Sequence, residues 1–229
     1  MVLDRKEFRP PVEYEGRTFD RQIHFDPRSA RYGVMEMIEE ATPRSYTWGC
    51  DVILDQGTEG ACVGFAVAAE LAAKPKEVGG VTNAFARMLY REAQKLDEWP
   101  GESYEGSSVL GGVKAAQARG HLSEYRWAFG IDDLAVAVSR MGPAILGINW
   151  YQGMYQTFSN RGQPWVAVEG RIVGGHAILA VGYSTTMKAF RLQNSWGSNW
   201  GHYGRAWIDH DALGFLLEAE GEACIPIKR

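Results

Sequence analysis

The chain has 229 residues, of which 45% are hydrophobic and 23% charged, and its 24 basic and 28 acidic side chains give a net charge of -4. This composition is typical of a globular protein with one domain or two small lobes. No lysine or arginine cluster indicates a nucleic-acid partner, and no apolar stretch is long enough to span a bilayer. We therefore expect neither a nucleic-acid nor a membrane partner.

The first 48 residues differ from the rest. They mix prolines with arginines and acids and show no sustained hydrophobic period, apart from a short helical patch over 32–40. No secretory leader is recognisable at the N-terminus. We interpret residues 1–48 as an arm or short pro-segment that packs on a domain formed by residues 49–229. A cytoplasmic protein is expected, while delivery by a non-classical route stays open.

Helices come first in the second part of the chain. An almost continuous apolar run predicts a buried helix, and three further helices follow. Thr82 or Asn83 is expected to cap the second helix, and Ser107 or Ser108 the third. The expected helices cover residues 61–73, 82–96, about 108–120 and 132–140.

Strands follow. Short apolar or alternating runs separated by glycine-rich turns occur at residues 144–149, 165–168, 176–183, 189–193 and 205–208. Helices followed by strands predict an α+β fold with a helical lobe and an antiparallel sheet or barrel lobe. A cleft between two such lobes is a natural substrate site.

Cys62 is the cysteine whose position indicates chemistry. It is the second residue of the first expected helix, directly after a turn that contains Gln56. The unpaired N–H groups and partial positive charge of a helix N-terminus favour a thiolate. Cys50 and Cys224 are expected to be buried thiols; a disulfide between them stays open, although a reducing compartment is the simpler interpretation.

One of the five histidines, His176, follows paired glycines that allow a close approach of backbone to another lobe or a ligand. Asn194 ends the next expected strand. An antiparallel pairing would bring its side-chain oxygen to one ring nitrogen of His176 and leave the other for the thiol. Trp196 and Trp200 would shield that hydrogen bond from water. The alternative is a turn with ordinary aromatic packing.

Three segments, in this chain order, resemble the motif blocks of papain-like cysteine peptidases. They are the turn from Gln56 to Cys62, Gly175-His176-Ala177 and Asn194-Ser195-Trp196-Gly197. The resemblance extends over about residues 46–210 and implies a papain-like two-lobe fold that acts on peptide or protein substrates. We also expect a monomer without a cofactor, and the scattered cysteines and histidines suggest no metal site.

The resemblance also implies roles for individual residues. Cys62 would attack the scissile carbonyl, His176 would move the proton and Asn194 would orient the imidazole. The Gln56 amide and the Cys62 N–H would hold the oxyanion. For substrate binding, the implied residues are Trp196 on the leaving-group side, Gly106 and Ser107 along an extended substrate backbone, and Gly175 and Ala177 beside the pocket for the substrate's second side chain.

The chain also departs from the family pattern. Val63 stands where the family usually has an aromatic residue, Glu59 stands where a cysteine is common, and the family's disulfide partners are missing. These features resemble intracellular prokaryotic or phage-like branches. We expect peptide hydrolysis through a thioester on Cys62. Two alternatives stay open: another acyl transfer, such as deamidation, transamidation or cyclisation, and a catalytically silent binding module.

Overall fold

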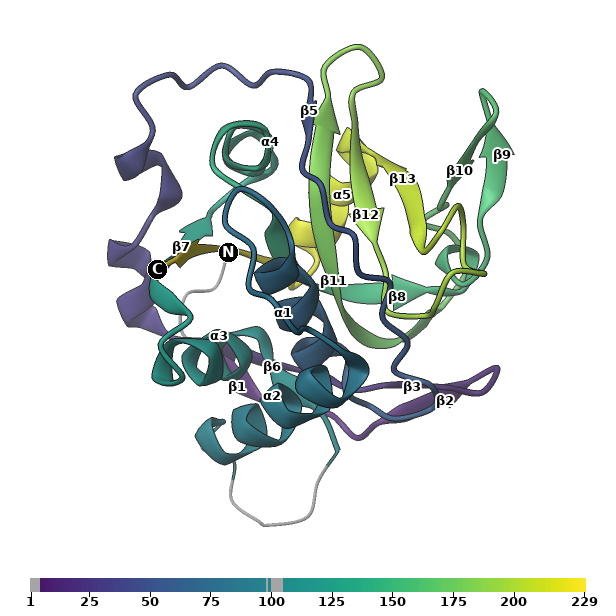
Figure 1. Cartoon of the computed structure of the whole chain (residues 1–229). Coiled ribbons are helices and arrows are strands. Elements are labelled where there is room, and N and C mark those ends of the chain that lie inside the picture. Colours follow the sequence, from purple (N-terminus) through teal and green to yellow (C-terminus); the bar gives the residue numbers. More distant parts are fainter. Residues whose placement is uncertain (1–4, 98, 100–104) are drawn as a thin grey trace.

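A computed structural model describes residues 5–97, 99 and 105–229, and it has a helical lobe and a sheet lobe (Figure 1). Helices α1, α2 and α3 pack on one another, whereas α4 and α5 lie against the sheet. The expected α+β arrangement is confirmed. The helices are α1 Cys62–Ala72, α2 Asn83–Leu96, α3 Val109–Ala118, α4 Ile131–Arg140 and α5 His210–Glu218, with 3-10 helices η1 Pro27–Arg31, η2 Val34–Met37 and η3 Gln152–Met154.

The sheet lobe is built on one large sheet in the order β7-β14-β8-β11-β12-β13-β10-β9, with β5 added on β11. Its strands pair antiparallel, as expected, except for the parallel pair β10 and β13. The strands of this sheet are β5 Tyr46–Thr47, β7 Leu122–Ala128, β8 Ala144–Tyr151, β9 Phe158–Asn160, β10 Gln163–Trp165, β11 Ile172–Ser184, β12 Ala189–Gln193, β13 Arg205–Asp209 and β14 Glu222–Lys228.

Several elements differ from the sequence expectations. Strand β11 begins at Ile172, so His176 lies inside a strand and not at its start; the register shifts next to Gly174, where φ is 140°. Strand β10 lies earlier than residues 165–168, and the helical patch at 32–40 is only the 3-10 turn η2. Strands β7 and β14 and helix α5 were not anticipated.

The expected helix caps are confirmed. Thr82 Oγ1 accepts from the Phe85 N–H at 3.3 Å, and Ser108 Oγ accepts from the Gly111 N–H at 3.0 Å. The Ser108 hydroxyl also donates to the buried carboxylate of Asp97 at 2.6 Å, which ties the end of α2 to the start of α3.

Residues 5–40, which we call the N-terminal segment, begin with a layer of short strands. Strand β4 (Arg21–Phe25) pairs antiparallel with β1 (Arg5–Glu7) and parallel with β6 (Ser107–Ser108) of the helical lobe. Strands β2 (Val12–Tyr14) and β3 (Arg17–Phe19) form a hairpin. Strands β2, β3 and β4 all contact β11, so this segment lies across both lobes (Figure 1).

A buried ion pair connects the helix that begins at Cys62 to the last strand. Glu70 Oε1 lies 3.2 Å from Lys228 Nζ, and this ammonium also donates to the carbonyl groups of Glu70 and Ala73. Burial raises the pKa of Glu70 to about 7, and Lys228 opposes that shift. Lys228 is therefore the cation that allows this acid to lie in the core.

Replacing Lys228 with methionine is expected to lower the free energy of unfolding by about 3–5 kcal/mol near pH 8, because a buried carboxylate loses its partner. The loss should be smaller near pH 5. The folded pKa of Glu70 lies above its ordinary value of 4.5. Its contribution to stability is therefore greatest below about pH 4.5 and is lost as the pH rises through about 7.

Urea unfolding of the wild type and Lys228→Met at both pH values measures this difference. The matched control is the double variant Lys228→Met/Glu70→Gln, in which no charge is left unpaired and much of the stability should return. Equal losses at pH 5 and pH 8, without recovery in the double variant, would contradict the explanation.

Candidate active site

Cys62 begins α1 at the boundary between the lobes. Ala61 is the N-cap residue, and the helix is buried along its whole length because its side chains are apolar on every side except at Glu70. The Cys62 Sγ accepts a hydrogen bond from the backbone N–H of Ala177 at 3.3 Å. The thiol of the helical lobe therefore lies beside the strand of the sheet lobe that carries His176.

His176 lies in β11, and Asn194 directly follows the neighbouring strand β12. His176 Nε2 and Asn194 Oδ1 are 2.9 Å apart, and the Ser195 N–H donates to the same oxygen at 2.9 Å. Because that oxygen can only accept, the neutral imidazole carries its proton on Nε2. The other ring nitrogen, Nδ1, is buried without a hydrogen-bond partner among the described residues and can accept a proton.

Aromatic rings enclose the His176–Asn194 pair. The imidazole centroid lies 5.2 Å from the Trp196 ring and 4.8 Å from the Trp150 ring, and Trp200 packs on Trp196 at 6.0 Å. Trp196 and Trp200 were expected near this hydrogen bond. Trp150 was missed, because only the pairing of β8 with β11 brings it to His176.

Gln56 is held by three hydrogen bonds. Its side-chain Nε2 donates to the Glu59 carbonyl at 2.9 Å, and its Oε1 accepts from the Ser195 hydroxyl at 2.6 Å. Its backbone N–H donates to the Ser195 carbonyl at 2.9 Å. One Nε2 hydrogen remains for an oxyanion. Ser195 stands in the motif after Asn194, but its part in orienting Gln56 was not anticipated.

The N-terminal segment covers these residues. The Cys62 thiol donates to Asp20 Oδ1 at 3.6 Å, and the Phe19 ring packs edge-on against His176 and Trp196, with centroids 5.8 Å apart in each case. The Thr18 hydroxyl donates to the carbonyl of Thr58 at 2.7 Å. Cys62 and His176 are consequently 0% exposed.

Burial sets the protonation of the covered pair. It raises the pKa of Cys62 well above its usual value, and the adjacent Asp20 carboxylate adds to that shift. Burial lowers the pKa of His176 to about 4, although the hydrogen bond to Asn194 opposes the shift. The helix N-terminus alone would favour a thiolate, as expected from the sequence, but desolvation outweighs it here. Thiol and imidazole are both neutral in the covered arrangement.

Three of the five residues expected to bind substrate, Gly106, Ser107 and Gly175, lie against the backbone of Asp20 or Arg21 in the N-terminal segment. Gly106 has φ of 94°, and a Cβ there would lie 2.1 Å from the Asp20 carbonyl; a Cβ at Gly175 would lie 2.5 Å from the Arg21 carbonyl. Ser107 pairs with Arg21 through the backbone, while its hydroxyl points away and donates to Asp97. Ala177 contacts the Cys62 thiol, and Trp196 covers His176 as expected.

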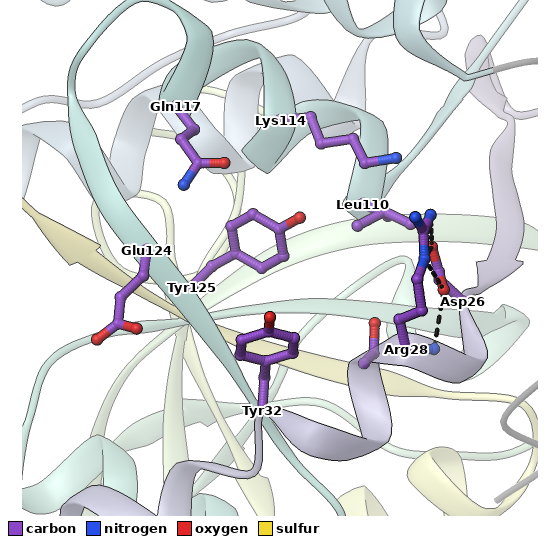
Figure 2. A pocket seen from close by; sticks show the side chains of 9 residues that line it. Asp26, Arg28, Tyr32, Leu110, Lys114, Gln117, Glu124 and Tyr125 are labelled. Atoms are coloured by element: carbon purple, nitrogen blue, oxygen red, sulfur yellow. Dashed lines mark hydrogen bonds and ion pairs between the residues drawn. The ribbon is translucent and has the colours of Figure 1, made fainter.

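A separate cavity of ≈ 310 Å³ lies where the N-terminal segment meets α3 and β7 (Figure 2). Its wall carries mixed charges, and the Arg28–Asp26 ion pair occupies one side. None of the candidate catalytic residues lines it. The lining residues are Asp26, Arg28, Ser29, Tyr32, Leu110, Lys114, Gln117, Glu124 and Tyr125.

Within the described part of the chain, no group of three His, Cys, Asp or Glu side chains is arranged to hold a metal ion. The cysteines Cys50, Cys62 and Cys224 are all buried and free, so the disulfide left open for Cys50 and Cys224 is not formed. No helix among the described residues is long and apolar enough to cross a membrane.

The structure is that of a two-lobed α+β protein. A cysteine of its helical lobe lies beside a histidine and an asparagine of its sheet lobe. Residues 77–214 match the family described as "Papain family cysteine protease". This range covers more than half of the chain; it contains His176 and Asn194 and begins after Cys62. The chain belongs to the papain family of cysteine proteases.

A curated relative supports this assignment. Cathepsin K from Gallus gallus is 33% identical over 132 residues, which cover 55% of this chain and 38% of that protein. The chain thus matches well under half the length of this curated relative.

Solved structures share the fold. Xylellain, a cysteine protease from Xylella fastidiosa, has a TM-score of 0.64 at 17% identity, with 100% of both chains covered. Digestive procathepsin L 3 of Tenebrio molitor larval midgut has a TM-score of 0.57 at 18% identity, covering 82% of this chain and 71% of that one. The ragweed pollen allergen Amb a 11, a cysteine protease in its proform, has a TM-score of 0.59 at 17% identity, covering 86% and 69%.

Proposed function

We propose that this protein is a cysteine peptidase that hydrolyses peptide bonds through a thioester on Cys62. The observation that supports it most directly is the site geometry. Asn194 binds one nitrogen of the His176 ring and leaves the other unpartnered, while the next residue along β11 donates its N–H to the Cys62 thiol. This arrangement suits proton transfer between a thiol and an imidazole.

The chemical steps follow from these contacts. The thiol proton moves to His176 Nδ1, and the Cys62 sulfur attacks the carbonyl carbon. The resulting oxyanion accepts hydrogen bonds from the Gln56 amide and the Cys62 N–H. The carbon–nitrogen bond then breaks as His176 gives its proton to the leaving amine. Water, deprotonated by His176, attacks the thioester; the carbon–sulfur bond breaks, the carboxylic acid leaves, and His176 returns the proton to the Cys62 sulfur. Throughout these steps Asn194 Oδ1 holds Nε2–H.

We propose that the N-terminal segment must leave the cleft before substrate can bind. The segment fills the space beside the thiol, and its burial of the pair keeps the nucleophile protonated. A substrate carbonyl needs the position beside Sγ that Asp20 occupies. The division of the chain into an arm over residues 1–48 and a catalytic part over 49–229 is part of this proposal, with one refinement: β5 at Tyr46–Thr47 pairs with β11 and would stay with the catalytic part.

Two other functions use the same residues. Another acyl transfer differs only in the acceptor of the thioester, and a silent binding module would keep the fold without turnover. The retained geometry of Gln56, Cys62, His176 and Asn194 favours a catalytic role. The free thiols and Val63 after the nucleophile support an intracellular, prokaryotic or phage-like branch and a cytoplasmic location as part of this proposal. We also propose a monomer that acts on peptides or proteins.

An epoxysuccinyl thiol probe and a mixed peptide library test the function together. With the N-terminal segment released, Cys62 should be labelled, and the label should be lost in His176→Ala. Hydrolysed peptides are expected, whereas deamidated or joined products would favour another acyl transfer. Absence of both labelling and products would favour the silent module. Intact-mass measurement after alkylation of the denatured, unreduced protein should show three modified thiols. Size-exclusion chromatography should give a monomer.

A further inference from the structure

Arg21 is a fully buried arginine in the segment that covers the site. Its side chain is 1% exposed, and the preceding residue, Asp20, contacts the Cys62 thiol. The Arg21 backbone lies between Ser107, with which it pairs, and Gly175, which its carbonyl approaches. Arg21 therefore occupies the backbone path expected for a substrate. It is the residue next to Asp20, which contacts the nucleophile.

The Arg21 side chain enters a pocket that is open because β8 carries a glycine. A Cβ at Gly147 would lie 2.9 Å from Arg21 Nε, 2.8 Å from Glu222 Oε1 and 2.9 Å from Val109 Cγ2. Any larger residue would fill the space that the guanidinium needs. We call this space the arginine pocket, defined by Val109, Gly147, Gly175 and Glu222.

Acceptors stand at the inner end of the arginine pocket. Glu222, which pairs with Gly147 across β14 and β8, is 2% exposed, and its Oε1 lies 4.0 Å from Arg21 Nη1. Arg21 Nη2 donates to the Glu220 carbonyl at 3.0 Å. A carboxylate and a carbonyl in a closed space suit a guanidinium.

Arg21 does not satisfy the acceptors of this pocket. Both Glu222 oxygens and Arg21 Nε are buried without a hydrogen bond among the described residues. Burial raises the pKa of Glu222 to about 7, while Arg21 opposes the shift and the buried Asp97 adds to it. Once the segment leaves, no other cation of the described residues lies beside this carboxylate. A side chain that forms two charge-assisted hydrogen bonds there would be bound strongly.

We propose that the arginine pocket selects a basic side chain, arginine above all, from the substrate, and that Glu222 determines this specificity. The inference rests on the peptidase function proposed above and concerns the pocket for the substrate's second side chain on the acyl side. Arg21 of the N-terminal segment occupies it until substrate replaces it. An apolar substrate side chain would leave Glu222 buried without a partner, and an acidic one would add a like charge.

Four fluorogenic peptides that differ only in the second residue before the scissile bond test this inference. Ratios of kcat/KM are compared, because partial covering of the site by the N-terminal segment affects all four peptides equally. The wild-type order should be Arg, then Lys, then Leu, with Glu slowest, and Arg should exceed Leu by about 10–100-fold.

Glu222→Gln should lower the Arg-to-Leu ratio by a similar factor, because the amide carries no charge. The matched control is Glu220→Gln. Its carboxylate binds Arg5 and Arg9 of the N-terminal segment, so its loss should change all four rates together and leave the ratio unchanged.

The outcomes separate this inference from the proposed function. Cleavage with Leu equal to or better than Arg in the wild type would overturn the specificity and leave the peptidase in place. Glu222 would then serve only to anchor Arg21. No cleavage of any peptide, together with no probe labelling at Cys62, would overturn both. The wild-type ratio decides even if Glu222→Gln fails to fold.

Discussion

Replacing Cys62 with alanine is expected to lower peptide hydrolysis at least about 10⁴-fold, because only binding and the oxyanion donors would remain. The thiol is the group that His176 deprotonates in the proposed mechanism, and the Ala177 N–H contacts it in the structure. Initial rates on an arginine-containing fluorogenic peptide, with the N-terminal segment released, measure this loss.

The matched control for that variant is Cys50→Ala. Cys50 is also a buried free thiol, but it contacts Gln193 and lies outside the candidate site, so its removal should leave hydrolysis largely unchanged. Circular dichroism and thermal unfolding should show that both variants fold. Substantial hydrolysis by purified Cys62→Ala would mean that another residue is the nucleophile, and the proposed mechanism would fail.

Releasing the N-terminal segment is expected to raise kcat/KM by on the order of 10²-fold, the ratio for a site that is open about one per cent of the time. A recognition sequence for a site-specific protease can be inserted between Glu40 and Ala41, which are both exposed. Cleavage there keeps β5 in the sheet. After the released peptide is separated, activity should rise, and adding the peptide back should inhibit competitively.

A substitution tests the same contact without cleavage. Phe19→Ala removes the ring that packs on His176 and Trp196, so basal activity should rise. Val12→Ala truncates the exposed apolar side chain that pairs with Phe19 across the same hairpin, and it should leave basal activity unchanged. If the cleaved protein is insoluble or no faster, and Phe19→Ala behaves like Val12→Ala, the segment is structural and does not restrict the cleft.

Local signals made much of the helical lobe predictable. The apolar run of α1, the cap at Thr82 and the cap at Ser108 are each recognised from residues only a few positions apart. Helix α5 was missed although Asp209 caps it in the same way, with its carboxylate accepting from two backbone N–H groups. Strand β14 was missed because its apolar residues are read as a strand only once β7 and β8 flank it.

The identities of the candidate residues were available from the sequence. Gln56, Cys62, His176 and Asn194 stand in segments that resemble the motif blocks of papain-like cysteine peptidases, in the family's order. The glycines before His176 indicate a close approach of backbone. The expected contact of His176 with Asn194 is present in the structure. Residue types, the order of the motif segments and the turn residues can be read directly from the chain. The sequence alone therefore determined which residues are the candidates.

Only the tertiary structure decided what surrounds these residues. Asp20 meets Cys62 across 42 positions and Arg21 contacts the Glu220 carbonyl across 199, so neither contact follows from a local pattern. The same packing removes water from the site, and desolvation then reverses the thiolate preference of the helix N-terminus. Burial depends on the whole chain. The protonation of Cys62 and the pocket at Glu222 are consequences of the fold as a whole.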